Sequence, residues 1–175
     1  MYVGRQADYK NIRRLADAHQ RLIKKYPDLG LILVGSKDSS AQTNEDIFNN
    51  KNYKNITFTG FMDDEYVNWL YENTSAYVFP SLMEGFGLPG LEAMGNGAPV
   101  VSSNATCLPE VYGDAAHYFD PTSVTDMAKS IDEVLSDETL RKKLIKNGFE
   151  QIRKYSWEKT SQQTHDVYMK VLDSK

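Results

Sequence analysis

Short apolar runs alternate with segments of mixed polarity over the first two thirds of the chain. Six of these runs have the length and composition of strands, at residues 1–4, 29–34, 56–61, 76–79, 99–101 and 115–119. The run at 29–34 is almost continuously aliphatic, as in a strand that is covered on both faces. Because segments of helix length separate the runs, the pattern predicts βαβ units. We therefore expect an α/β fold with a doubly wound, mostly parallel, six-stranded sheet of the Rossmann-like type.

The segments between the runs carry helix signals of unequal strength. Apolar residues recur at helical spacing over 12–26, and Pro27 ends that segment. Residues 45–48 carry a weak helical signal, and Asp63-Asp64 can cap a helix after the third strand. Only helices are expected after the sixth strand, with three capping residues: Ser123, Asp137 and Ser156. No linker or repeat divides the chain, so residues 1–175 are expected to form a single domain with extra C-terminal helices.

Composition limits the class of protein without identifying it. The chain is 41% hydrophobic and 25% charged, which is typical of a globular domain, and its net charge of -4 argues against a nucleic-acid partner. Cys107 is the single cysteine, which excludes an intramolecular disulfide framework and fits a reducing, cytoplasmic compartment.

The most informative segment is a glycine-rich turn between two glutamates. Glu84 and Glu92 flank residues 85–90, Gly-Phe-Gly-Leu-Pro-Gly, which follow the fourth predicted strand and precede a short helical stretch at 91–95. A strand, a glycine turn and a helix N-terminus form a site for anions, because free N–H groups and the helix dipole favour negative charge. Acidic side chains beside such a site should repel a bare phosphate, but they can bind hydroxyl groups of a ligand. The combination predicts a ligand with both phosphates and hydroxyls, namely a nucleotide-sugar.

Two basic residues follow the first strand. Arg5 and Lys10 can reach one anion, the first as a planar fork and the second as a point charge, but spacing alone fits solvated surface charges equally well. The turn also satisfies G-x-G-x-x-G, with Glu110 about 20 residues later. A dinucleotide site is the minor interpretation, because this turn follows the fourth strand instead of the first and contains Pro89.

The remaining chemistry-bearing residues have simple explanations. Glu92 would be favoured in a first helical turn in any case, whereas Glu84 lies beside apolar Met83 and Phe86, where a carboxylate is more often functional. The three histidines lack partners at metal-ligand spacing, and helix capping explains the acidic residues at 63–65. We expect no metal site, and we expect Cys107 to be a small buried apolar residue.

Several segments together resemble a known family. Four segments resemble the donor-binding half of retaining glycosyltransferases of family 4, which have the two-domain GT-B architecture: residues 79–89 (Phe-Pro-Ser-Leu-Met-Glu-Gly-Phe-Gly-Leu-Pro), Leu91-Glu92-Ala93-Met94, Gly97-Ala98-Pro99-Val100-Val101 and Leu108-Pro109-Glu110-Val111. Tyr2-Val3-Gly4-Arg5 with Lys10-Asn11 and the closing Tyr155-Ser156-Trp157 resemble the start and the last helix of that half. The resemblance covers essentially the whole chain in the right order.

The resemblance implies a role for each matching residue. Arg5 and Lys10 would bind the donor diphosphate, together with the backbone of four residues of the turn: Gly85, Phe86, Gly87 and Leu88. Glu92 would bind the ribose, and main-chain groups near Phe61 and Met62 would recognise the base. Glu84 would face the transferred sugar as the candidate catalytic residue. The co-substrate would be a UDP- or GDP-sugar, with no cofactor and no metal.

The chain departs from the family pattern in two respects. Gly90 stands where the family more often has a larger apolar residue and Gly95-Asn96-Gly97 is looser than usual, and both are expected to weaken the helix. The acceptor-binding N-terminal half is absent from the sequence, so we expect a C-terminal fragment that is inactive alone and whose other partner is a saccharide or lipid-linked acceptor. The full-length enzyme would be cytoplasmic, with peripheral attachment to the inner membrane face as an option. A stand-alone nucleotide-sugar-binding regulatory module and a related GT-B enzyme, such as a sugar epimerase or a phosphorylase, remain as alternatives.

Overall fold

The computed structural model describes residues 1–174, and its strands lie where the apolar runs predict them. The six strands are β1 Tyr2–Val3, β2 Leu31–Val34, β3 Ile56–Gly60, β4 Tyr77–Phe79, β5 Val100–Ser103 and β6 Ala116–Phe119. All paired strands are parallel, and they form two three-stranded sheets of order β1-β2-β3 and β4-β5-β6. Parallel pairing throughout requires a crossover between successive strands, which the helices provide.

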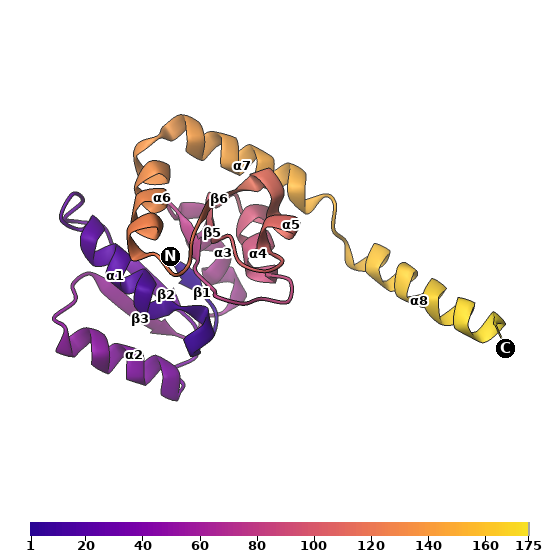
Figure 1. Ribbon diagram of the computed structural model, residues 1–175, viewed down its shortest axis with the longest axis horizontal. Helices are drawn as coiled ribbons and strands as arrows, with labels where there is room; N and C mark the ends of the chain where they lie inside the picture. The colour runs from indigo at the N-terminus through magenta and orange to yellow at the C-terminus, as the bar shows by residue number, and fades with distance from the viewer. Residues whose placement is uncertain (175) are drawn as a thin grey trace.

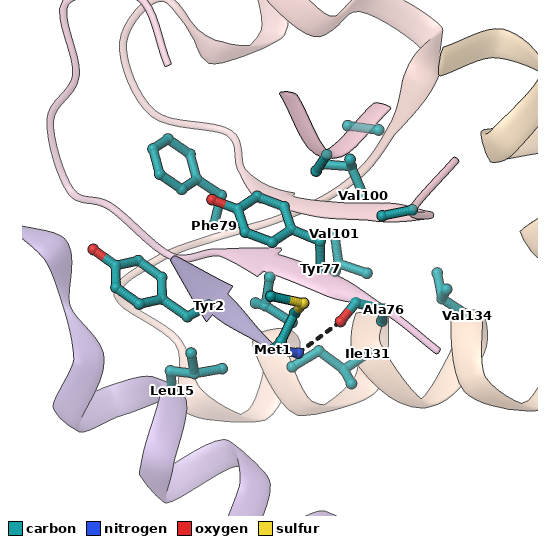
Figure 2. Packing of buried hydrophobic residues seen from close by; sticks show 14 of the residues in the cluster. Met1, Tyr2, Leu15, Ala76, Tyr77, Phe79, Val100, Val101, Ile131 and Val134 are labelled. Atoms are coloured by element: carbon teal, nitrogen blue, oxygen red, sulfur yellow. Dashed lines mark hydrogen bonds between the residues drawn. The ribbon is translucent and has the colours of Figure 1, made fainter. Parts of the chain in front are cut away.

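Hydrogen bonds at Met1 join the two halves of the sheet. The Met1 amino group donates to the Ala76 carbonyl at 2.8 Å, and the Val78 amide donates to the Met1 carbonyl at 2.9 Å, as Figure 2 shows for the first bond. The strand order across the molecule is therefore 3-2-1-4-5-6, with β1 at the centre. Because the Met1 amine is buried there, its pKa is lowered to about 5. The predicted six-stranded, doubly wound arrangement is confirmed, with this joint between its halves.

Helices cover both sides of the strands. The first-half helices are α1 Ile12–Leu22 and α2 Ser39–Asn50, and α6 Val124–Ser136 returns to pack against α1. The second-half helices are α3 Asp64–Asn73, α4 Leu88–Gly95 and α5 Leu108–Tyr112, with α7 Glu138–Ile152 packed on α4. These two groups lie on opposite sides of the strands in Figure 1. Figure 2 shows the same separation in the core, where Tyr77 and Phe79 lie on the face opposite Leu15 and Ile131.

The expected caps are present at the C-terminal helices. Ser123, Asp137 and Ser156 each accept a hydrogen bond from a main-chain N–H in the first turn of their helix. The weak signal at 45–48 underestimates α2, which runs for 12 residues because the Asp38 carboxylate caps its start. The short helix α5 has no counterpart among the predicted elements, because its five residues are too few for a periodic pattern.

The last helix, α8 Trp157–Asp173, projects away from the rest of the molecule (Figure 1). None of its residues is buried. Its apolar residues are accordingly exposed, among them Trp157, Val167, Tyr168 and Leu172. Among the described residues, no helix has the length and apolar character needed to cross a bilayer.

Candidate functional site

The loops that leave the carboxyl ends of the strands are tied to one another. The Gly4 amide donates to the Val34 carbonyl at 2.9 Å, and the Gly35 amide donates to the Gly60 carbonyl at 3.2 Å, so the ends of β1, β2 and β3 meet. The Leu82 amide donates to the Tyr9 carbonyl at 2.8 Å, which joins the segment after β4 to the loop after β1. Ligands of doubly wound folds bind at this edge of the sheet, where the strand order reverses between β1 and β4.

An ion pair between Lys10 and Glu84 lies at this point of reversal. Lys10 Nζ is 2.6 Å from Glu84 Oε1, and the two side chains are only 13% and 12% exposed. The ammonium also lies 5.2 Å and 5.3 Å from the ring centroids of Tyr9 and Phe79. An ion pair this enclosed is screened little by water, so each charge depends strongly on its partner or on a ligand that replaces it.

The glycine-rich turn carries the start of α4 toward the same edge. Gly87 is the N-cap of α4, has a φ of 90° and has no side chain with which to cap the first turn. The Tyr112 hydroxyl donates to the Gly87 carbonyl at 2.5 Å and thereby sets the position of the turn. Within the first turn Pro89 has no N–H and the Gly90 amide donates to the Gly87 carbonyl at 3.1 Å, so the Leu88 amide is the first-turn donor left for an anion.

Gly90 has a packing role that the sequence does not reveal. A Cβ atom at this position would overlap the ring and hydroxyl of Tyr112, which is fully buried. The departure of Gly90 from the family pattern therefore makes room for Tyr112, a packing role that the expected weakening of the helix does not include. By contrast, a Cβ atom at Gly85 would meet no heavy atom within 4 Å, so that residue is open toward solvent.

Three other predicted site residues, Arg5, Glu92 and Phe61, are exposed. The Arg5 side chain is 79% exposed and lies 3.6 Å from Asp38, so the structure does not bring it to Lys10. Glu92 is exposed on α4, and partial burial of its carboxyl group raises its pKa, with the charge of Asp64 adding to the shift. Phe61 is 80% exposed and follows Gly60 at the end of β3.

Met62 is half-buried and packs against the hydrophobic core. The main chain at 61–62 lies between the end of β3 and the start of α3, and its recognition of the base stays a prediction.

An apolar groove of about 490 Å³ adjoins the glycine-rich turn. Its lining residues come from the start of α4, the end of α7 and the start of α8: Phe86, Leu88, Leu91, Glu92, Ile152, Tyr155, Ser156, Trp157 and Thr160. The Phe86 and Tyr155 rings meet edge to face, with centroids 5.5 Å apart. This contact fixes one side of the turn, so the closing Tyr155-Ser156-Trp157 segment belongs to the surroundings of the site.

The structure adds residues that spacing does not indicate. Tyr112 contacts the turn from α5, and Cys107 is half-buried with its Sγ 3.3 Å from the Glu84 carbonyl, so it does not lie in the core as expected. No sequence signal marks either contact, because 23 and 25 positions separate the partners. Within residues 1–174, no group of three or more His, Cys, Asp or Glu side chains is placed to hold a metal ion.

Comparison with known proteins identifies the family. A model of the family described as glycosyl transferases group 1 matches residues 1–151. The chain belongs to this family. The resemblance of the glycine-rich segment to glycosyltransferases is thereby confirmed.

Two relatives from Escherichia coli illustrate the similarity. An O-antigen chain mannosyltransferase B is 37% identical over 173 residues, which cover 96% of this chain and 45% of that protein. The serotype-specific mannosyltransferase WbdA is 40% identical over 119 residues, covering 68% of this chain and 15% of that protein. The group 1 chain described here therefore spans less than half the length of these relatives.

Solved structures share the fold. Sucrose-phosphate synthase from Thermosynechococcus elongatus superposes with a TM-score of 0.88 at 28% identity, covering 99% of this chain and 45% of that one. HepE from Anabaena, solved in complex with UDP, gives a TM-score of 0.83 at 21% identity and covers 97% of this chain and 48% of that one. The group 1 chain thus has the Rossmann-like fold of the C-terminal half of GT-B glycosyltransferases.

Proposed function

We propose that this chain is the donor-binding half of a retaining glycosyltransferase that takes sugar from a nucleoside diphosphate and transfers it to a growing polysaccharide. The enclosed Lys10–Glu84 pair beside the uncapped start of α4 carries the proposal, because it places one cation and one carboxylate at an anion site. The family supports the reaction class, and the names of the relatives support mannose as the sugar. The base is guanine or uracil.

Each part of the donor then has a partner of matching charge. The diphosphate would lie between Lys10 and the Leu88 amide at the start of α4, with the exposed Arg5 side chain turning in from solvent. Each charge-assisted hydrogen bond would stabilise the complex by about 1.5–3 kcal/mol. Glu92 would accept from the ribose hydroxyls, and the main chain at 61–62 would recognise the base.

The reaction would depend on compensating the charge of the leaving diphosphate. As the glycosidic bond breaks, negative charge grows on the phosphate oxygens and positive charge grows at the anomeric carbon. Lys10 would stabilise the first, and Glu84 would face the second and hold the sugar hydroxyls. When the diphosphate binds, it would replace the Glu84 carboxylate as the partner of the Lys10 ammonium. The Glu84 carboxylate would then be free to bind the sugar.

Calorimetric titration of the 175-residue chain with GDP, UDP and NAD tests the proposal. We expect saturable binding of GDP or UDP, and we expect Arg5→Ala and Glu92→Ala each to raise the Kd about tenfold, which corresponds to about 1.4 kcal/mol of binding free energy. Lys143→Ala and Glu158→Ala are matched controls on exposed faces of α7 and α8 and should bind as the unaltered chain does. Binding of NAD in preference to GDP and UDP would instead support a dinucleotide site and contradict the proposal.

A further inference from the structure

Two residues with left-handed backbone lie directly beside the Lys10–Glu84 pair. Among residues 1–174, four non-glycine residues have positive φ: Asn11, Asn52, Asn55 and Thr106. Asn11 immediately follows Lys10, and Thr106 is hydrogen-bonded to Glu84. Asparagine adopts this conformation at modest cost, but a β-branched residue such as threonine rarely does. Such backbone persists only where the surrounding structure enforces it, and it is concentrated at functional sites.

Asn11 connects three segments that the sequence separates widely. Its carboxamide donates to the Pro80 carbonyl at 3.0 Å and to the Pro121 carbonyl at 2.8 Å, and its Oδ1 accepts from Arg14 at 2.9 Å. The residue is only 5% exposed, so water competes little for these bonds. Through its side chain, Asn11 therefore ties the main chain that directly follows Lys10 to the segment that leads from β4 to Glu84.

Thr106 holds the other member of the pair through its main chain. The Glu84 amide donates to Thr106 Oγ1 at 3.2 Å, and the Thr106 hydroxyl donates to the Glu84 carbonyl at 3.2 Å. One hydroxyl group can make both bonds, since it is a donor and an acceptor at once. The Cys107 Sγ lies 3.3 Å from the same carbonyl. The loop after β5 thus fixes the backbone of residue 84, and with it the direction of the carboxylate.

We propose that Asn11 and Thr106 are positioning residues that together hold the Lys10 ammonium and the Glu84 carboxylate in the geometry that the donor diphosphate and sugar require. The inference rests on the proposed function for its purpose, although the positioning itself can be measured without any ligand. Small displacements of charged groups in such sites reduce binding and catalysis strongly, so supports of this kind contribute without touching the ligand.

The test observes the Lys10 ammonium directly. In a ¹⁵N-labelled chain, a lysine ammonium that is hydrogen-bonded and shielded from water gives a side-chain ¹H–¹⁵N signal, which Lys10→Gln would identify by its loss. We expect the signal in the unaltered chain and its loss, or an exchange rate raised at least about tenfold, in Asn11→Gly and in Thr106→Ala. Glycine keeps the left-handed backbone at position 11, so Asn11→Gly removes only the carboxamide.

Two matched variants serve as controls. Thr106→Ser retains the hydroxyl and should retain the signal, and Asn52→Gly makes the same change at a left-handed asparagine in the turn after α2, which should leave the signal unaltered. Thr106 is exposed, so Thr106→Ala tests the proposal even where Asn11→Gly unfolds the chain. An unchanged Lys10 signal in Thr106→Ala, or no signal in the folded unaltered chain, would overturn the positioning role.

Titration of the same variants with GDP and UDP separates the positioning role from the proposed function. Loss of the Lys10 signal with an affinity reduced at least fivefold supports both. Loss of the signal with unchanged affinity supports positioning and counts against the proposed role of the pair in donor binding. Reduced affinity with an unchanged signal overturns the positioning role alone.

Discussion

At Gly90, the ring of Tyr112 occupies the space that any side chain would need. We expect Gly90→Ala to lower the free energy of unfolding by about 1–3 kcal/mol, because the added methyl group forces either α4 or Tyr112 to move. Urea denaturation measures the change. Gly85→Ala in the same turn meets no neighbour and should not destabilise the chain. Equal stability of the two variants would contradict the packing role of Gly90.

The Lys10–Glu84 pair should show strong energetic coupling. We expect Lys10→Met and Glu84→Gln each to destabilise the chain by about 1–3 kcal/mol, because each leaves one charge enclosed without its partner. The double variant should lower the free energy of unfolding by less than the sum of the two single variants. The difference, which is the coupling energy of the pair, should be about 1–3 kcal/mol.

The exposed pair of Lys25 and Asp132 is the internal comparison for that cycle. Its side chains are 57% and 30% exposed, so the same double-mutant cycle should give a coupling below about 1 kcal/mol. A similar coupling at the two pairs would mean that enclosure does not strengthen the Lys10–Glu84 interaction.

The residues of the site could be predicted only in part from the sequence. The glycine-rich turn and its two glutamates are contiguous, so their pattern is visible in one segment. The pairing of Lys10 with Glu84 spans 74 positions and depends on the loop after β1 lying beside the segment after β4. The side chains of Tyr112, Asn11 and Thr106 bond to main-chain groups of other residues. Every residue type has such groups, so the sequence at the contacted position does not reveal the contact.

At the scale of the elements, strands were easier to predict than helix ends. Buried parallel strands are nearly continuous apolar runs, which marks β2 and β4, whereas β3 shows as an alternating pattern and β5 ends in two serines. The helix α2 is mostly polar, so periodicity reveals only its middle, and the Asp38 cap shows its start only once the backbone is known. The C-terminal caps were predicted because serine or aspartate precedes a clearly periodic segment there.

The buried amine at the start of β1 should make the stability of the 175-residue chain depend on pH. Its pKa falls from about 8 in the unfolded chain to about 5 in the folded one, so between these values the unfolded state binds more protons. The free energy of unfolding should therefore rise from pH 5 to pH 8, with no further contribution above 8 and the full penalty below 5. Three pKa units correspond to a contribution of up to about 4 kcal/mol.

Acetylation of Met1 isolates this contribution. The acetylated chain keeps an N–H that can donate to Ala76 but has no amine to titrate. Urea denaturation at pH 5 and pH 8 gives the free energy of unfolding of each chain at both pH values. The change in this free energy between the two pH values should be larger for the chain with the free amine than for the acetylated chain. The same pH dependence in the two chains would mean that the carboxylates and histidines account for it.

At the scale of the whole molecule, α8 should be the least stable element. A helix of 17 residues with no buried side chain has only its intrinsic propensity to stabilise it, and isolated helices of that length are marginal in water. In hydrogen exchange by mass spectrometry, we expect the amides of 161–173 to exchange nearly as fast as in an unfolded peptide, while those of α1 and β5 remain protected.

A truncation supplies the thermodynamic counterpart. Deletion of residues 161–175 should leave the urea midpoint of the remaining chain unchanged, because α8 contributes no buried side chain to the core. A substantial loss of stability, or protected amides in α8, would show that this helix packs on the chain or on a second copy of it.

The position of β1 also has a consequence for how the chain folds. The half made of β1, β2 and β3 precedes β4 in the sequence, so it can form before β4 is synthesised. Until β4 arrives, one edge of β1 offers unpaired N–H and C=O groups to any other extended chain. The bond from Met1 to Ala76 closes that edge across 75 positions. Joining the halves should therefore be a slow step of folding, and the half-formed sheet should be the species most prone to aggregate.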